Sequence, residues 1–126
     1  MMKNLNVTCI GAGVIGSGWA ARLLVNGINV NVFDKRPESY NRTRLSVERA
    51  KKYLSQLTKA PLREMGSLTF EKSLEGALKT STYIIESLPE NLQLKHNLYK
   101  EIEQLSNDYI ILSSTSGFKP VTFKSI

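Results

Sequence analysis

Short apolar runs alternate with longer amphipathic stretches along the whole chain. Most of the runs end at a glycine, an aspartate, a proline or a serine-rich turn, which is typical of buried strands. The expected strands cover residues 5–10, 28–33, 67–70, 83–88 and 109–112. Between them, apolar residues recur at steps of three and four, as on the buried side of a helix. The expected helices cover residues 14–26, 37–60, 74–78 and 94–105.

Strands that alternate with helices predict an α/β fold, a doubly wound, mostly parallel sheet with helices on both faces and right-handed crossovers. In such a sheet, ligands bind outside the carboxyl ends of the strands, where the strand order reverses. Functional residues are therefore expected directly after the strands. The segments concerned are 11–16, 34–36, 88–95 and 113–117.

The run after the first expected strand fits the pattern G-x-G-x-x-G and opens a helix. In that context the pattern predicts a dinucleotide-binding loop, with a plain glycine-rich turn as the alternative. Gly11 is expected to make the tight turn, Gly13 to let a pyrophosphate approach the backbone, and Gly16 to let the helix pack close to the strand. Val14 and Ile15 begin the helix, whose free N–H groups would face the phosphates.

Asp34 ends the second expected strand and follows the loop by about 20 residues, which is the spacing of the acidic residue in this fingerprint. Its carboxylate is expected to accept hydrogen bonds from both hydroxyls of the adenosine ribose and to repel the 2′-phosphate of NADP. Lys35 and Arg36 mildly favour NADP, since a cation there could hold that phosphate. Because the like-charge clash with Asp34 is more direct, the sequence predicts NAD as the cofactor.

Four segments together resemble the N-terminal NAD-binding domain of the L-3-hydroxyacyl-CoA dehydrogenase family. They are residues 10–16, 33–34, 86–95 and 113–117. The resemblance extends from about Val7 to Phe123, and the Glu-Asn-Leu-x-x-Lys segment at 90–95 is far more specific than the glycine loop. It implies a Rossmann fold, NAD as the cofactor and hydride transfer from a secondary alcohol.

The resemblance also implies roles for three polar residues. Glu90 and Lys95 match the positions that contact the ribose and nicotinamide side of NAD in this family, and Ser116 matches the serine that hydrogen-bonds the substrate oxygen. Taken alone, Glu90 would be a charge at a helix N-terminus, Lys95 a solvated helix lysine and Ser116 an ordinary turn or cap serine.

Two segments, residues 16–22 and 115–117, are most similar to the members of the family that oxidise carnitine. Gly117 replaces the second serine that acyl-CoA members more often have there. The segment between Lys51 and Ser67 is also short for a CoA-binding helical hairpin. The resemblance therefore implies carnitine as the small-molecule substrate, with a 3-hydroxyacyl thioester as the alternative.

The family's catalytic histidine belongs to a His-x-Phe-Asn-Pro segment, which does not occur in this sequence. We expect residues 1–126 to form the NAD-binding domain, the helical catalytic and dimerisation domain to be absent from this chain, and the parent protein to be a homodimer. His96 is expected to face solvent on a helix rather than to act as a base. A stand-alone module that binds NAD without catalysis is the rival interpretation.

Composition adds limits to this picture. The 126 residues include 17 Lys and Arg against 11 Asp and Glu, a net charge of +6. The basic segment 35–52 is interpreted as a solvated helix face, or else as a patch that attracts a phosphorylated ligand. Without interleaved aromatic residues or a recognition motif, nucleic acid is not an expected partner. A single cysteine, Cys9, and a single histidine predict no metal site. The lack of a signal or a long apolar run predicts a cytoplasmic protein without a membrane segment.

Overall fold

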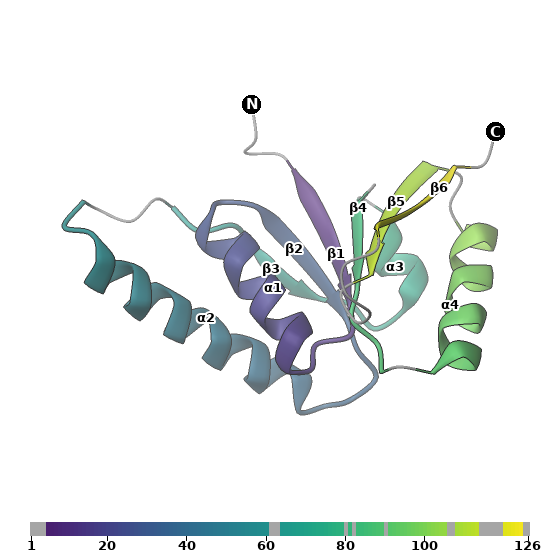
Figure 1. Ribbon diagram of the computed structural model, residues 1–126, viewed down its shortest axis with the longest axis horizontal. Helices are drawn as coiled ribbons and strands as arrows, with labels where there is room; N and C mark the ends of the chain where they lie inside the picture. Colours follow the sequence, from purple (N-terminus) through teal and green to yellow (C-terminus); the bar gives the residue numbers. More distant parts are fainter. Residues whose placement is uncertain are drawn as a thin grey trace.

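Six strands form one sheet in the order β3-β2-β1-β4-β5-β6 (Figure 1). The computed structural model describes residues 5–60, 64–79, 81, 83–89, 91–105, 108–113 and 120–124. Neighbouring strands from β3 to β5 are parallel, and β6 pairs antiparallel with β5. The strands are β1 (Asn6–Ile10), β2 (Asn29–Phe33), β3 (Leu68–Phe70), β4 (Tyr83–Glu86), β5 (Asp108–Ser113) and β6 (Pro120–Lys124). The mostly parallel sheet that the sequence predicts is therefore confirmed.

The described helices cover both faces of this sheet, as expected for a doubly wound fold. In Figure 1, α1 and α2 lie on one side of the sheet and α3 and α4 on the other. The helices are α1 (Val14–Val25), α2 (Ser39–Leu57), α3 (Leu74–Leu78) and α4 (Leu92–Leu105). None of them combines the length and the apolar character that a membrane crossing requires.

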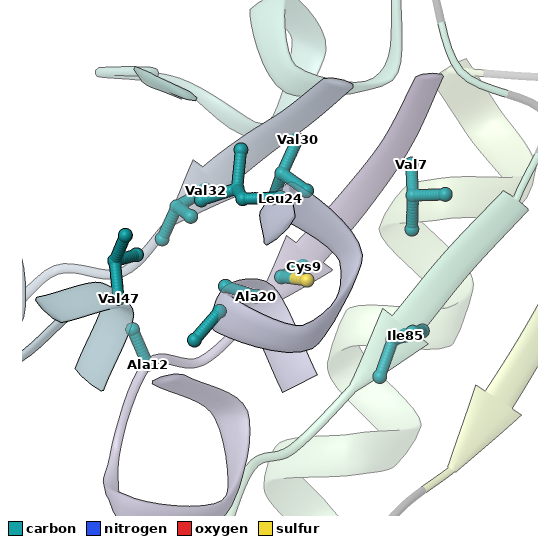
Figure 2. Packing of buried hydrophobic residues seen from close by; sticks show 10 residues of the cluster. Val7, Cys9, Ala12, Ala20, Leu24, Val30, Val32, Val47 and Ile85 are labelled. Atoms are coloured by element: carbon teal, nitrogen blue, oxygen red, sulfur yellow. The ribbon is translucent and has the colours of Figure 1, made fainter. Parts of the chain in front are cut away.

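Alternation along β1 divides the core into two clusters. Val7 and Cys9 point to one face, where they join Ala20 and Leu24 of α1 (Figure 2). Ile10 belongs to the second cluster, on the face covered by α3 and α4. Successive residues of a strand point to opposite faces, so a central strand with helices on both sides buries both of its sets of side chains.

Cys9 lies in the first of these clusters and is 1% exposed. Burial raises the pKa of its thiol from 9.0 to about 12. The thiol is therefore protonated at neutral pH, as expected for a structural rather than a reactive cysteine.

The strand order reverses beside β1. Its neighbours are β2 on one side and β4 on the other, so the chain crosses over β1 between the two halves of the sheet. In doubly wound sheets this reversal opens a crevice at the carboxyl ends of the strands. The segments that follow β1, β2 and β4 therefore meet at one edge of the sheet.

Three details differ from the expected elements. Strand β6, at the edge of the sheet, was not predicted. It begins at Pro120, and an edge strand tolerates a proline because the missing N–H is not needed for pairing with a further strand. On α4, Leu98 and Ile102 are buried, but Leu94 and Leu105 are about 40% exposed because the core reaches only the middle turns of the helix. On α2, the apolar spacing Val47, Ala50, Leu54 and Leu57 predicts one buried side, but Leu57 is exposed in the last turn.

Candidate functional site

The loop between β1 and α1 lies at the edge of the sheet where the strand order reverses. Gly11 adopts φ +92°, a conformation that residues with side chains rarely adopt. Its N–H donates a hydrogen bond to the Phe33 carbonyl at 2.9 Å. A Cβ on Gly11 would also lie 2.8 Å from the Ser87 carbonyl oxygen. Both conformation and space therefore require glycine at the turn.

Gly16 and Gly13 have different surroundings. A Cβ on Gly16 would overlap the Gly11 carbonyl oxygen and lie 3.2 Å from the Ser87 Cβ, so glycine lets α1 pack close to the loop. Among the described residues, a Cβ on Gly13 would meet only the Arg36 side chain, 3.5 Å from its Nη2 atom. The position at Gly13 is thus open to an approaching ligand, whereas the position at Gly16 is closed by the protein itself.

The N-terminus of α1 follows directly. Gly13 is its N-cap residue and gives no side-chain hydrogen bond, and its first turn contains no acidic residue. Val14 and Ile15 are exposed, 84% and 54%. The first N–H groups of a helix lack intrahelical acceptors and carry a partial positive charge. This end of α1 can therefore receive an anionic group.

Asp34 follows β2 and points back toward the loop. Its Oδ2 atom accepts a hydrogen bond from the Ala12 N–H at 2.7 Å, and its side chain is 6% exposed. The Arg36 guanidinium holds the same carboxylate, with Nε 3.0 Å from Oδ1 and Nη2 2.7 Å from Oδ2. Burial raises the pKa of Asp34, but the hydrogen bonds from Arg36 and Ala12 outweigh burial, and the pKa lies below its ordinary value. Asp34 is therefore an anion fixed beside the glycine loop.

A second carboxylate, Glu86, lies at the end of β4 and is fully buried. It accepts hydrogen bonds from the Leu88 N–H at 2.7 Å and from the Tyr99 hydroxyl at 3.1 Å, and the Lys95 Nζ lies 3.8 Å from its Oε1. Burial and the negative charge of Glu86 raise the pKa of Tyr99 to about 12. A buried carboxylate is stable only when it is paired and hydrogen-bonded in this way.

The position of Lys95 corrects the interpretation of this residue as a solvated helix lysine. Its side chain is only 12% exposed, because α4 directs it toward Glu86. Glu86 was not predicted as a site residue. It could have been found as a carboxyl residue that ends an otherwise apolar strand, since such a carboxylate must find partners inside the fold.

A shallow cavity of about 390 Å³ lies along the first turns of α4. It is lined by Leu92, Gln93, Lys95, His96 and Tyr99. His96 is exposed on this helix, as predicted. Within the described part of the chain, no group of three or more His, Cys, Asp and Glu side chains could hold a metal ion.

Two of the predicted site residues, Glu90 and Ser116, lie outside the described residues. The described residues flanking them are placed at the same sheet edge. Ser113 ends β5 opposite Glu86 in the register and forms a hydrogen bond with Tyr99. The structure thus brings together the glycine loop, Asp34 and the Glu86–Lys95 pair at the carboxyl edge.

Nearly the whole chain matches one known protein family. Residues 6–125 match the family described as "3-hydroxyacyl-CoA dehydrogenase, NAD binding domain". The chain belongs to this family. The resemblance seen in the sequence is thereby confirmed, and the chain is the NAD-binding domain of a 3-hydroxyacyl-CoA dehydrogenase-family protein.

Two curated relatives in this family carry carnitine in their names. An L-carnitine dehydrogenase of Mesorhizobium japonicum is 43% identical over 112 residues, 88% of this chain and 31% of its own length. An L-carnitine dehydrogenase/betainyl-CoA thioesterase of Ruegeria pomeroyi is 45% identical over 112 residues, 88% of this chain and 23% of its own length. The chain therefore spans less than a third of either relative.

A solved structure of this fold shares the same architecture. The crystal structure of 5-formyl-3-hydroxy-2-methylpyridine 4-carboxylic acid 5-dehydrogenase, an NAD⁺-dependent dismutase, superimposes with a TM-score of 0.75 at 34% identity. The match covers 93% of this chain and 38% of that one. The α/β architecture of the 3-hydroxyacyl-CoA dehydrogenase family member described here is thus that of a known dehydrogenase.

Proposed function

We propose that this chain binds NAD at the glycine loop. The observation that carries the proposal is the contrast between the three glycines. Gly11 and Gly16 are closed in by the protein, while Gly13 is open at an uncapped helix N-terminus. A pyrophosphate placed there would receive backbone N–H groups from Gly13, Val14 and Ile15 and would meet the positive end of α1. The family match supports the same ligand.

Asp34 would bind the adenosine ribose. Its carboxylate lies beside the loop, so ribose hydroxyls could donate to it while the pyrophosphate lies on α1. The 2′-phosphate of NADP would bring a second anion to the same carboxylate. The site therefore favours NAD over NADP.

Lys95, Glu90 and Ser116 would serve the nicotinamide half of the site, as the family resemblance implies. Glu86 holds the Lys95 ammonium near the end of β4, which supports a placement of Lys95 facing the crevice. Ser116 would hydrogen-bond the substrate oxygen. When bound, NAD supplies the hydride acceptor, and these side chains orient the two reactants.

We propose that residues 1–126 form the NAD-binding domain of a longer, homodimeric enzyme that oxidises the secondary alcohol of carnitine. Both curated relatives named above are carnitine dehydrogenases and are more than three times as long as the matched segment. A further helical domain would supply the base that takes the hydroxyl proton and would close the site from water.

The substrate is tested on the longer protein by following NADH formation with L-carnitine and, separately, with a 3-hydroxybutyryl thioester. We expect turnover with carnitine and little with the thioester. The reverse preference would assign the protein to the acyl-CoA branch of the family instead. NAD binding without turnover of either compound would favour a non-catalytic NAD-binding module.

A further inference from the structure

Arg36 occupies the carboxylate to which the adenosine ribose would bind at the proposed NAD site. Its guanidinium forks the Asp34 carboxylate through Nε and Nη2, and its Nη2 atom is 3.5 Å from the place of a Cβ on Gly13. The side chain therefore spans from the ribose-binding carboxylate to the phosphate-binding loop. Arg36 can reach both because it lies two residues after Asp34, in the turn that follows β2.

The hydrogen bonds of Asp34 leave no acceptor position for a ribose. A carboxylate accepts about four hydrogen bonds. Asp34 receives four, from the Ala12 N–H, the Arg36 N–H, the Arg36 Nε–H and the Arg36 Nη2–H. The two backbone donors are fixed by the loop and the turn. Ribose hydroxyls can therefore reach Asp34 only when the guanidinium leaves it.

Arg36, rather than Asp34, is the partner that solvent reaches. The Arg36 side chain is 47% exposed, whereas that of Asp34 is 6% exposed. Solvent weakens an ion pair at its exposed partner, and after release the Ala12 and Arg36 N–H groups would still hold the Asp34 carboxylate. Once released, the guanidinium remains tethered beside Gly13, at the edge of the ribose position, where a 2′-phosphate would project.

We propose that Arg36 is a specificity-determining residue of this site, which competes with the ribose of NAD for Asp34 and pairs with the 2′-phosphate of NADP. This inference rests on the proposed NAD site. A guanidinium binds a phosphate through two parallel N–H donors, which offsets the repulsion from Asp34. Arg36 therefore narrows the preference for NAD that Asp34 alone would give.

The neighbouring Lys35 provides a matched control. It carries the same charge one residue closer to Asp34 in sequence, but it is exposed and has no hydrogen bond or ion pair with any described residue. Lys35→Gln and Arg36→Gln each remove one positive charge from the same turn. Only the second removes the fork on Asp34.

The test is calorimetric titration of the 126-residue chain and both variants with NAD⁺ and NADP⁺, at one fixed ionic strength. For Arg36→Gln we expect NAD⁺ to bind about twofold to fivefold more tightly, the range of an exposed ion pair. We expect the ratio Kd(NADP⁺)/Kd(NAD⁺) to rise about tenfold, equivalent to ~1.4 kcal/mol. Lys35→Gln should change that ratio by less than about twofold, as a rim charge does.

The titrations distinguish a failure of the proposed NAD site from a failure of the role proposed for Arg36. If the unchanged chain binds neither cofactor, the proposed NAD site fails, and this inference fails with it. If the chain binds NAD⁺ but the ratio moves equally in the two variants, Arg36 has no special role and the inference alone is overturned. Weaker NAD⁺ binding by Arg36→Gln would also overturn it, since the guanidinium would then support the bound dinucleotide. Titration with 5′-AMP and adenosine 2′,5′-bisphosphate repeats the comparison with ligands that differ only in the 2′-phosphate.

Discussion

Residues of the same type at the carboxyl edge of the sheet differ in their surroundings. Gly11, Gly13 and Gly16 share a residue type, yet two are enclosed by backbone and one is open. Asp34 and Glu86 are both buried carboxylates, but Asp34 is held by an arginine at the rim, while Glu86 is held by Lys95 and Tyr99 beneath it. The sequence predicted the tight turn at Gly11 and the close packing at Gly16, which the structure shows, while the ligand-binding roles of Gly13 and Asp34 stay predictions. It did not predict the Arg36 fork or the burial of Lys95, because side-chain partners across a turn or between elements leave no periodic pattern.

Asp34→Ser should reduce the preference for NAD over NADP. The serine hydroxyl keeps a hydrogen-bonding group but removes the charge that repels the 2′-phosphate. We expect the difference in binding free energy between the two cofactors to shrink by about 1–2 kcal/mol, the worth of one or two charge-assisted hydrogen bonds. Calorimetry with both cofactors measures it, and an unchanged preference would remove Asp34 from the ribose site.

The lowered pKa of Asp34 predicts how the stability of the protein depends on pH in acid. Because the pKa of Asp34 is lower in the folded protein than its ordinary value of 3.8, the ionised form is favoured by folding. Its contribution is present above that ordinary pKa and is lost as the pH falls through the lower folded value. Urea unfolding of the chain and of Asp34→Asn between about pH 6 and pH 3 should therefore show a smaller loss of stability in the variant. Parallel pH profiles would contradict this assignment.

At the level of elements, α1 supplies the helix N-terminus of the proposed site. Its N-terminus faces the crevice, and its buried side, through Ala20 and Leu24, fixes it on β1 and β2. The periodicity of the sequence predicted this helix and the strands on either side, because they are central and buried. It failed at the margins. The edge strand β6 and the ends of α4 contact the core less, so their sequences are less constrained by burial.

Two glycines of α1 form a matched pair for testing how closely this helix is packed. A Cβ on Gly16 overlaps the Gly11 carbonyl oxygen, while a Cβ on Gly18 has no atom of the described residues within 4 Å. Gly16→Ala should lower the free energy of unfolding by about 1–3 kcal/mol or more, since the loop must move. Gly18→Ala should raise it by about 0.5–1 kcal/mol, since alanine favours a helix. Chemical denaturation measures both, and equal effects would contradict the packing described for the loop.

At the scale of the whole molecule, the glycine loop, Asp34 and the Glu86–Lys95 pair lie at one sheet edge, and none of the described residues there is an evident proton acceptor for alcohol oxidation. His96 is exposed on α4, and the buried carboxylates Asp34 and Glu86 are engaged by protein donors. The family match covers nearly the entire chain, whereas the chain covers less than a third of the two curated relatives. Fold and family could be predicted from sequence because the loop and its spacing are local. Carnitine as the substrate is implied only by the resemblance of residues 16–22 and 115–117, since the groups that select the substrate are expected in another domain.

The 126-residue chain by itself should therefore show no dehydrogenase activity with L-carnitine. A positioned general base alone is worth about 100- to 10,000-fold in rate, and a second domain would also bind the substrate and exclude water. NADH formation is the measurement, with His96→Ala as the control. Turnover that survives this substitution would show that a group within these residues serves as the base.

The most direct test of the NAD site is a calorimetric titration of the chain and of Gly13→Val with NAD⁺. The valine side chain would occupy the place of the pyrophosphate, while among the described residues its Cβ would meet only the Arg36 side chain, at 3.5 Å. We expect the unchanged chain to bind NAD⁺ and Gly13→Val to lose at least about a hundredfold in affinity, ~2.7 kcal/mol, with an unfolding midpoint close to that of the unchanged chain. Normal NAD⁺ binding by a folded Gly13→Val protein would contradict it.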